Sequence, residues 1–253
     1  MLIHGDCLKE MDKLIEQGVK VDAIITDIPY GTTNCKWDSV IPFDEMWNRL
    51  KLLRLDKTPI VLFGAEPFSS TLRMSNIKEY KYDWIWHKNW ASGHLNSKRQ
   101  PMRNHENISA FYKKQCLYNY IKQPRVMKEQ TKKRHSYGYK VNEGKEDVSC
   151  NTYNEYKEMS RVKELDLELA FPTTIQNFDV IHRSKLVHPT QKPVKLMEYL
   201  IKTYTNEEDT VLDFTMGSGS CGIACNNLNR NFIGIEKDLT YYNIACERIN
   251  KTI

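Results

Sequence analysis

Apolar and polar positions follow a regular pattern through the first 75 residues. Short apolar, mostly β-branched runs predict three buried strands, at 1–4, 21–26 and 60–63. Apolar residues at helical spacing predict three amphipathic helices, at 8–15, 43–55 and 67–74. Strands that alternate with helices indicate an α/β fold, in which a doubly wound, mostly parallel sheet carries helices on both faces.

The same pattern returns in the last third of the chain. Apolar positions predict helices at 194–204, 220–228 and 239–249, separated by short strands at 211–212 and 231–235. Pro193 is suited to the first turn of the first of these helices, because its fixed φ matches that position.

The middle of the chain differs. Residues 82–86 and 107–112 read as strands around a polar loop at 91–103, whereas 115–178 shows no strand–helix–strand pattern. The sequence therefore predicts a domain formed by 1–114 and 181–253, with an insertion at 115–180.

The start of this insertion is strongly basic. The net charge is only +5, but residues 113–140 carry nine lysines and arginines against a single acid, Glu129. Tyrosines are interleaved with these bases, a pattern typical of a surface that binds a polyanion. The alternative is a solvated loop. The candidate phosphate contacts within the insertion are Lys132, Lys133 and Arg134. Those outside it are Lys98, Arg99, Arg103 and Arg183.

Composition limits the cellular setting and the metal chemistry. No apolar run approaches the ~18 residues of a membrane span, and no signal peptide opens the chain. The seven cysteines include no C-x-x-C pair, and the histidines show no ligand spacing. We therefore expect a cytoplasmic protein with reduced thiols, no metal site and no membrane partner.

A glycine turn follows the strand at 211–212. Residues 217–222 match G-x-G-x-x-G between a strand and a helix, and Glu236 ends the next strand, where an acid can bind ribose hydroxyls. NAD, FAD and S-adenosylmethionine sites share this pattern, and a structural turn remains an alternative. Only 17 residues follow Glu236, too few for the further strands of a dinucleotide fold, so the pattern favours S-adenosylmethionine.

Asp27-Ile28-Pro29-Tyr30 follows the strand at 21–26. Asp27 and the carbonyl of Ile28 can accept both N–H bonds of an exocyclic base amine, and Pro29 holds Ile28 extended. Tyr30 offers a flat face for a base turned out of the duplex. Alone, an acid followed by a proline turn is common, so its pairing with the glycine turn is what indicates methyl transfer to a DNA base.

Together these motifs resemble the amino-methylating DNA methyltransferases of the permuted β group, whose catalytic motif precedes the cofactor motif. Residues 5–8, 86–88, 105–108, 188–193 and 232–236 resemble further segments of that family. The resemblance implies the S-adenosylmethionine-dependent methyltransferase fold, circularly permuted. In it, 1–114 is the catalytic half, 181–253 is the cofactor-binding half and 115–180 is an inserted target-recognition region.

The resemblance also implies roles for particular residues. Asp27, Ile28, Pro29 and Tyr30 form the catalytic motif. Asp6 and Cys7 would contact the cofactor adenine, and Lys192 would lie near its carboxylate. The whole implied cofactor set is Asp6, Cys7, Asp27, Lys192, Asp213, Phe214, Thr215, Gly217, Ser218, Gly219 and Glu236. Duplex DNA is the implied partner, with a homodimer and a restriction endonuclease as further candidates.

The sequence departs from the family pattern twice and leaves the acceptor open. Ile28 replaces the first proline of D-P-P-Y, and Phe214-Thr215 replaces Pro-Phe in the cofactor motif. Aspartate at position 27 resembles adenine-N6 enzymes, whereas serine is more frequent in cytosine-N4 enzymes. The alternatives are a cytosine amine, an RNA base, or a non-catalytic DNA-binding protein with a decayed site.

Overall fold

The computed structural model describes residues 1–32, 35, 38–124 and 169–251. They belong to two compact units, one formed by Met1–Asn119 with Thr173–Ile253 and the other by Tyr120–Pro172. In the second unit, β6 (Gln123–Pro124) pairs antiparallel with β7 (Leu169–Ala170). The site described below lies entirely in the first unit.

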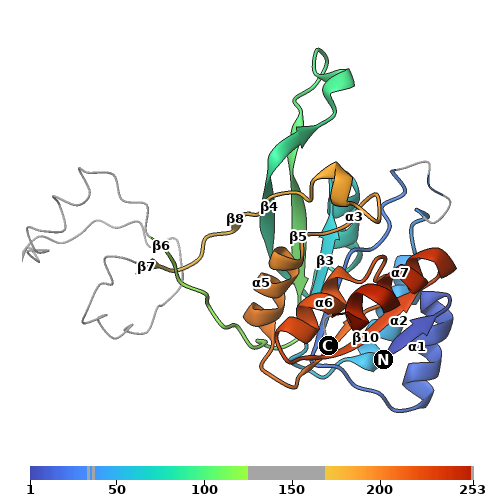
Figure 1. The fold of residues 1–253 in the computed structure, drawn as a ribbon. Coiled ribbons are helices and arrows are strands. Elements are labelled where there is room, and N and C mark those ends of the chain that lie inside the picture. The colour runs from blue at the N-terminus through green and yellow to red at the C-terminus, as the bar shows by residue number, and fades with distance from the viewer. Residues whose placement is uncertain (33–34, 36–37, 125–168, 252–253) are drawn as a thin grey trace, which may run out of the picture. The chain divides into compact units, whose positions relative to one another are not determined.

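Within the described residues, the first unit contains one sheet of eight strands. Their bounds are β1 Leu2–His4, β2 Ala23–Thr26, β3 Ile60–Gly64, β4 Tyr80–Ser92, β5 Arg103–Phe111, β8 Ile175–Asn177, β9 Thr210–Asp213 and β10 Asn231–Glu236. The order across the sheet is β1-β10-β9-β2-β3-β5-β4-β8 (Figure 1). Only β5 runs antiparallel to its neighbours β3 and β4, which confirms the predicted mostly parallel α/β sheet.

The sheet joins the two ends of the chain. β9 and β10, from the last third, lie between β1 and β2 from the first. Leu212 of β9 is in register with Ile24 of β2, so these strands end side by side. Because the carboxyl ends of neighbouring parallel strands share one edge, Asp27 after β2 and Asp213 at the end of β9 are brought together.

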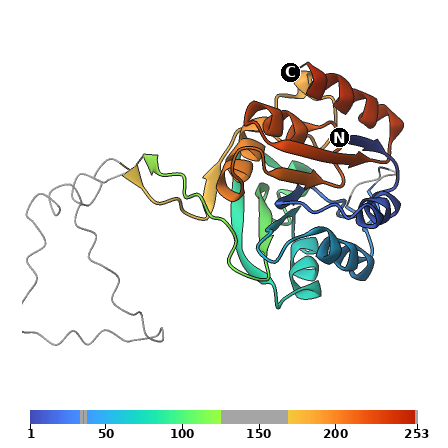
Figure 2. The ribbon, with the colours of Figure 1, turned by 90° about the horizontal axis from the view of Figure 1, so that it is seen from below.

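Helices cover both faces of the sheet. Their bounds are α1 Cys7–Glu16, α2 Phe43–Leu53, α3 Phe68–Ser75, α5 Val194–Tyr204, α6 Ser220–Asn227 and α7 Leu239–Asn250. α1, α2 and α3 lie on one face, and α5, α6 and α7 lie on the other (Figure 2). The apolar stripe that predicted α2 is buried at Met46, Trp47, Leu50 and Leu53.

Several element limits differ from the sequence prediction. β4 and β5 are longer than expected and form the hairpin that extends beyond the other strands in Figure 1. β8 was not predicted, because Ile175–Asn177 is a short and mostly exposed segment. Pro193 lies just before α5, at its N-cap, rather than in its first turn.

β8 also bears on the limits of the insertion. Its pairing with Ile85–His87 of β4 places Ile175–Asn177 in the main sheet, inside the segment 115–180 that the sequence sets apart. The compact unit runs only from Tyr120 to Pro172.

In the described part of the chain, no helix is both long enough and apolar enough to span a membrane.

Candidate active site

A cavity of about 930 Å³ opens at the carboxyl ends of β1, β2, β9 and β10. Its walls contain most of the residues that the sequence predicted for catalysis and cofactor binding. Those that line it are Asp6, Cys7, Asp27, Ile28, Pro29, Tyr30, Lys192, Asp213, Phe214, Thr215, Gly217, Ser218 and Glu236. Gly219 alone of that predicted set is not among the lining residues. This edge is where open α/β sheets hold their ligands.

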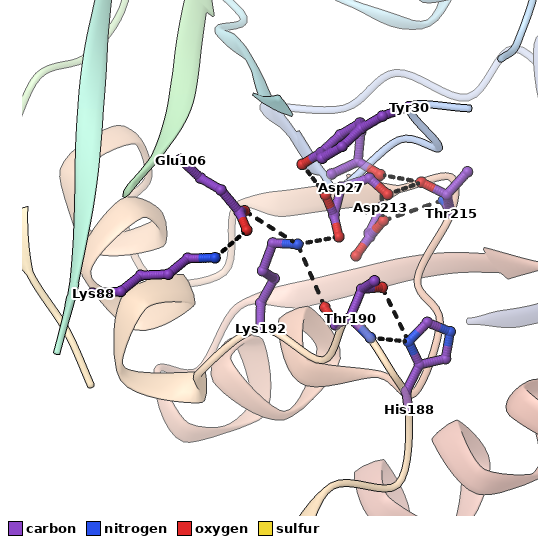
Figure 3. A network of polar contacts seen from close by, with 10 residues as sticks. Asp27, Tyr30, Lys88, Glu106, His188, Thr190, Lys192, Asp213 and Thr215 are labelled. Atoms are coloured by element: carbon purple, nitrogen blue, oxygen red, sulfur yellow. Dashed lines mark hydrogen bonds and ion pairs between the residues drawn. The ribbon is translucent and has the colours of Figure 1, made fainter. Parts of the chain in front are cut away.

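Asp27 lies at the centre of a polar network (Figure 3). Its Oδ1 accepts a hydrogen bond of 2.6 Å from the Tyr30 hydroxyl, and its Oδ2 forms an ion pair with the ammonium of Lys192. Burial raises the pKa of the Asp27 carboxyl, and the Lys192 charge opposes that shift. Both carboxylate oxygens therefore have partners in this structure.

Lys192 connects Asp27 to a second carboxylate. Its Nζ lies 3.5 Å from Oε2 of Glu106, and Oε1 of Glu106 pairs with Lys88. Burial alone would raise the pKa of Glu106, but these two ammonium groups leave it lower than usual. The pKa of Lys192 is raised, because its two carboxylates outweigh its own burial. The four residues form a chain of alternating charge in which Lys192 is buried and the other three are partly buried.

Asp213 lies beside Asp27 and has hydrogen-bond partners of its own. Its Oδ1 accepts hydrogen bonds from Oγ1 of Thr26 at 2.6 Å and from the amide of Thr215 at 3.2 Å. Burial raises the pKa of the Asp213 carboxyl to about 7, even though these hydrogen bonds lower it. At neutral pH this carboxyl is therefore close to half protonated.

Replacing Asp213 by asparagine tests this state through stability. A carboxyl whose folded pKa is raised loses stabilisation as the pH rises from about 4 through 7. The neutral Asp213→Asn side chain keeps an acceptor for Thr26 and carries no such penalty. We expect its free energy of unfolding in urea, relative to wild type, to rise by a few kcal/mol between pH 5 and pH 8. An equal change at both pH values would contradict a raised pKa.

Thr215 explains one departure from the family pattern. Its Oγ1 donates to the carbonyl oxygen of Asp27 at 3.0 Å, which ties the turn after β9 to the loop after β2. Phe214, the residue before it, is 1% exposed and belongs to the hydrophobic core. The threonine thus supplies a hydrogen bond at the position where the family has an aromatic ring.

Two glycines of the turn after β9 have different roles: Gly217 lines the cavity, and Gly219 packs against α7. Gly217 has φ +51° and donates its amide to Oε2 of Glu236 at 2.9 Å. Gly219 has φ +81°, and a Cβ on it would lie 2.9 Å from Cδ1 of Ile249 in α7. Gly219 therefore contributes through helix packing, which accounts for its absence from the cavity lining.

Three further predicted residues make contacts at the cavity edge. Asp6 caps α1, where its Oδ1 accepts from the Leu8 amide at 3.2 Å, and its Oδ2 pairs with Lys237 at 3.2 Å. Burial raises the pKa of the Cys7 thiol to about 11, so Cys7 offers an uncharged surface. Ser218 is held by Arg248, whose Nη1 donates to its Oγ at 2.9 Å.

His188 lines the same cavity without the basicity of a catalytic histidine. Its ring packs edge-on against Tyr241, with ring centroids 4.1 Å apart, and its Nδ1 lies 3.2 Å from the amide nitrogen of Thr190. Burial and the nearby Lys192 charge lower the pKa of the His188 ring to about 4. These contacts are those of a turn residue.

The predicted DNA contacts fall at three places. Lys98 and Arg99 are exposed at the tip of the β4–β5 hairpin, and Arg103, which pairs with Ser92 just below that tip, lines the cavity. Arg183 is exposed in the turn before α5. The remaining three, Lys132, Lys133 and Arg134, lie outside the described residues. Among the residues that are described, no group of three histidine, cysteine or acidic side chains is arranged to hold a metal ion.

Glu106 and Lys88 were not assigned a role from the sequence. Both lie in segments that resemble the family's base-pocket lining, at 105–108 and 86–88. The resemblance therefore pointed to these segments, but it gave no role to the charge of either side chain. Both line the cavity, and the Lys88 ammonium also lies 4.5 Å from the centre of the Trp86 ring.

Known proteins are similar to this chain in sequence and in fold. A family model described as DNA methylase, for N6 and N4 methyltransferases, matches residues 21–247. The type II methyltransferase M.HpaI of Haemophilus parainfluenzae is 26% identical over 265 residues, which cover 98% of this chain and 74% of that protein. M1.MboII of Moraxella bovis, also a type II methyltransferase, is 27% identical over 95% of this chain and 92% of its own length.

A solved structure agrees over the full length. The crystal structure of the M1.HpyAVI–SAM complex matches with a TM-score of 0.65 at 26% identity, covering 99% of this chain and 98% of that one. The sheet and its strand-end cavity define a Rossmann-like methyltransferase fold. Because the family model covers most of the chain, the chain belongs to the DNA methylase family of N6/N4 amino-methyltransferases. S-adenosylmethionine is the methyl donor of this class.

Proposed function

We propose that this protein methylates the N6 amine of adenine at a specific sequence in duplex DNA, with the target base turned out into the cavity. One observation carries the proposal: Asp27 and the glycine turn at Gly217 line a single cavity. A base amine and a methyl donor can therefore meet there. The order of the two motifs along the chain supports the permuted β arrangement.

The cavity has the size and polarity that S-adenosylmethionine needs. Its volume of about 930 Å³ lies within the range of small-molecule sites. Glu236 would accept hydrogen bonds from the ribose, and Asp6 from the adenine amine. Among the described residues, no group hydrogen-bonds to the buried Oγ of Ser220, which also lines the cavity. These groups suit a polar, nucleoside-sized ligand.

The bound cofactor would supply an electrophilic methyl group on a sulfonium. The base amine is a poor nucleophile, because its lone pair is delocalised into the ring. Asp27 and the carbonyl of Ile28 would accept its two N–H bonds and direct the lone pair towards the methyl carbon. As the N–C bond forms, the amine must lose one proton, and Asp27 is the carboxylate placed to accept it.

Tyr30 would hold the base in plane. Its ring lies 5.0 Å from that of Phe68 between centroids, and its hydroxyl is fixed by Asp27. Such a fixed ring suits stacking of a base that has left the duplex, a contact worth ~1–3 kcal/mol. Arg103 and the exposed basic side chains of Lys98 and Arg99 at the β4–β5 hairpin tip would contact phosphates on the flanking DNA.

Adenine is favoured over cytosine by the residue at position 27. Aspartate there resembles the N6 enzymes of the family, and the cytosine-N4 amine is the second candidate. A restriction endonuclease partner, a homodimer and a cytoplasmic location all stay predictions. So does the role of 115–180 in target recognition, since most of that segment lies outside the described residues.

Expression in a methylation-deficient bacterial host tests the function directly. We expect long-read sequencing of the host DNA to show N6-methyladenine at one short motif, and mass spectrometry of the digested nucleosides to identify the same base. N4-methylcytosine would move the assignment to the second candidate. Retained DNA binding with no modified nucleoside would instead support a decayed, non-catalytic protein.

A further inference from the structure

Both carboxylate oxygens of Asp27, the proposed acceptor of the target amine, already have protein partners in this structure. Oδ1 accepts from Tyr30, and Oδ2 is paired with Lys192. A base amine that takes Oδ2 as its acceptor competes with the Lys192 ammonium for that oxygen, and one that takes Oδ1 competes with the Tyr30 hydroxyl. Tyr30 belongs to the same short loop as Asp27, whereas Lys192 comes from the segment before α5, so Lys192 is the partner that can leave independently.

A second carboxylate, that of Glu106, lies next to Lys192. Oε2 of Glu106 is buried, and none of the described residues hydrogen-bonds to it. It lies 3.5 Å from Nζ of Lys192, at the outer limit for a hydrogen bond (Figure 3). A buried carboxylate oxygen without a donor costs free energy, so this oxygen gains from any closer approach of an ammonium group.

The rest of the network leaves Glu106 fixed while Lys192 moves. Lys88 holds Oε1 of Glu106 from β4, so Oε2 stays directed at Lys192. Lys192 carries three N–H donors, and a hydrogen bond to the carbonyl of Thr190 at 3.4 Å lies within its present reach. A shift of the ammonium towards Glu106 therefore keeps Lys192 paired with a carboxylate, while Asp27 exchanges the ammonium for the neutral base amine.

We propose that Glu106 is a positioning residue that receives the Lys192 ammonium when the target base enters, and so frees Oδ2 of Asp27 for the base amine. The inference rests on the proposed function of Asp27. In the base-free state Lys192 neutralises Asp27; in the base-bound state it pairs with Glu106. Removal of the cation also makes Asp27 a better acceptor for the amine proton.

Glu106→Gln removes the destination while it keeps the size of the side chain. The substrate is unmethylated genomic DNA from a methylation-deficient host, with tritiated S-adenosylmethionine as donor. We expect the single-turnover rate to fall by ~10–100-fold, because a hydrogen bond to a charged group is lost only in the base-bound state. Cofactor affinity in calorimetry should stay within about threefold, and Glu106→Asp, which keeps the charge, should recover part of the rate.

The pH profile separates this role from general damage. The titratable groups that face Asp27 are Lys192, Tyr30, Glu106 and Asp213, of which the Tyr30 hydroxyl is neutral. Glu106 is the one removed, and its negative charge raises the pKa of Asp27. In Glu106→Gln, the acid limb of kcat/KM should therefore move to lower pH while the plateau falls. A structural defect alone would lower the plateau and leave the limb in place.

Glu79→Gln is the matched control. Glu79 is also partly buried and pairs with Arg54 at 2.6 Å, but it does not line the active-site cavity. We expect this variant to keep the wild-type rate and pH profile. A Glu106→Gln rate equal to that of Glu79→Gln would overturn the exchange while the proposed function stands. An equal loss of cofactor affinity would assign the Lys192–Glu106 pair to the donor instead, and an inactive wild type would refute both proposals.

Discussion

Asp27→Asn is expected to lower methyl transfer by ~10²–10⁴-fold, the range for a positioned group that takes part in proton transfer. The asparagine keeps the shape of the side chain, but it cannot accept the amine proton. It also leaves Lys192 paired with Glu106 alone. Cofactor binding should be retained, because most of the proposed cofactor contacts come from the turns after β1, β9 and β10. Single-turnover transfer of tritiated methyl to unmethylated DNA measures the first effect, and calorimetry measures the second.

Asp56→Asn provides the control for this substitution. Asp56 is exposed and pairs with Lys113 and Lys114 outside the cavity, so its removal should leave both measurements near wild type. An Asp27→Asn rate within tenfold of wild type would remove Asp27 as the amine acceptor. A matching loss of cofactor affinity would place its main role in holding the donor.

The fold could be predicted because local patterns and one topological rule were sufficient. Residues 23–26 and 60–64 are buried at every position, and their continuous apolar sequence signals strands enclosed on both faces. The end of a parallel strand then fixes where the next residues must lie. For that reason Asp27 and Asp213, 186 positions apart, could be expected at one cavity from the sequence.

The charged chain through Lys192 could not be predicted in the same way. Glu106 lies in a strand whose outer half is polar, so no periodicity distinguishes it from an ordinary exposed acid. Its partners Lys88 and Lys192 depend on side-chain direction across the hairpin and on the path of the segment before α5. Neither feature follows from residue type or spacing.

The two departures from the family pattern are also explained only by tertiary contacts. Ile28 is 3% exposed and packs in the core cluster beneath the cavity, a place where an aliphatic side chain is as suitable as proline. Thr215 gains a hydrogen bond to the Asp27 carbonyl that an aromatic residue could not make. Both substitutions preserve the loop that presents Asp27, which argues against a decayed site.

Lys192→Met is expected to have the largest effect on stability. The methionine is similar in length but carries no ammonium, so it loses the contact of the Lys192 Nζ with the Phe63 ring, whose centre lies 5.3 Å away. It leaves Asp27 and Glu106 buried beside each other with one fewer cation, and breaking a buried ion pair costs ~3–5 kcal/mol. Urea unfolding at pH 8 measures this loss. Lys195→Met, an exposed lysine on α5, should stay within ~0.5 kcal/mol of wild type.

The pH dependence identifies the cause of that loss. Burial already raises the pKa of Asp27, and without Lys192 nothing of comparable charge opposes the shift. A carboxyl whose folded pKa is raised is most stabilising when protonated, so the variant should lose stability as the pH rises from 5 to 8. In wild type, Lys192 has a raised pKa and keeps its charge throughout this window. The deficit of Lys192→Met should therefore be small at pH 5 and reach its full size by pH 8. A deficit that is the same at both pH values would mean that Lys192 contributes through packing and that Asp27 does not depend on its charge.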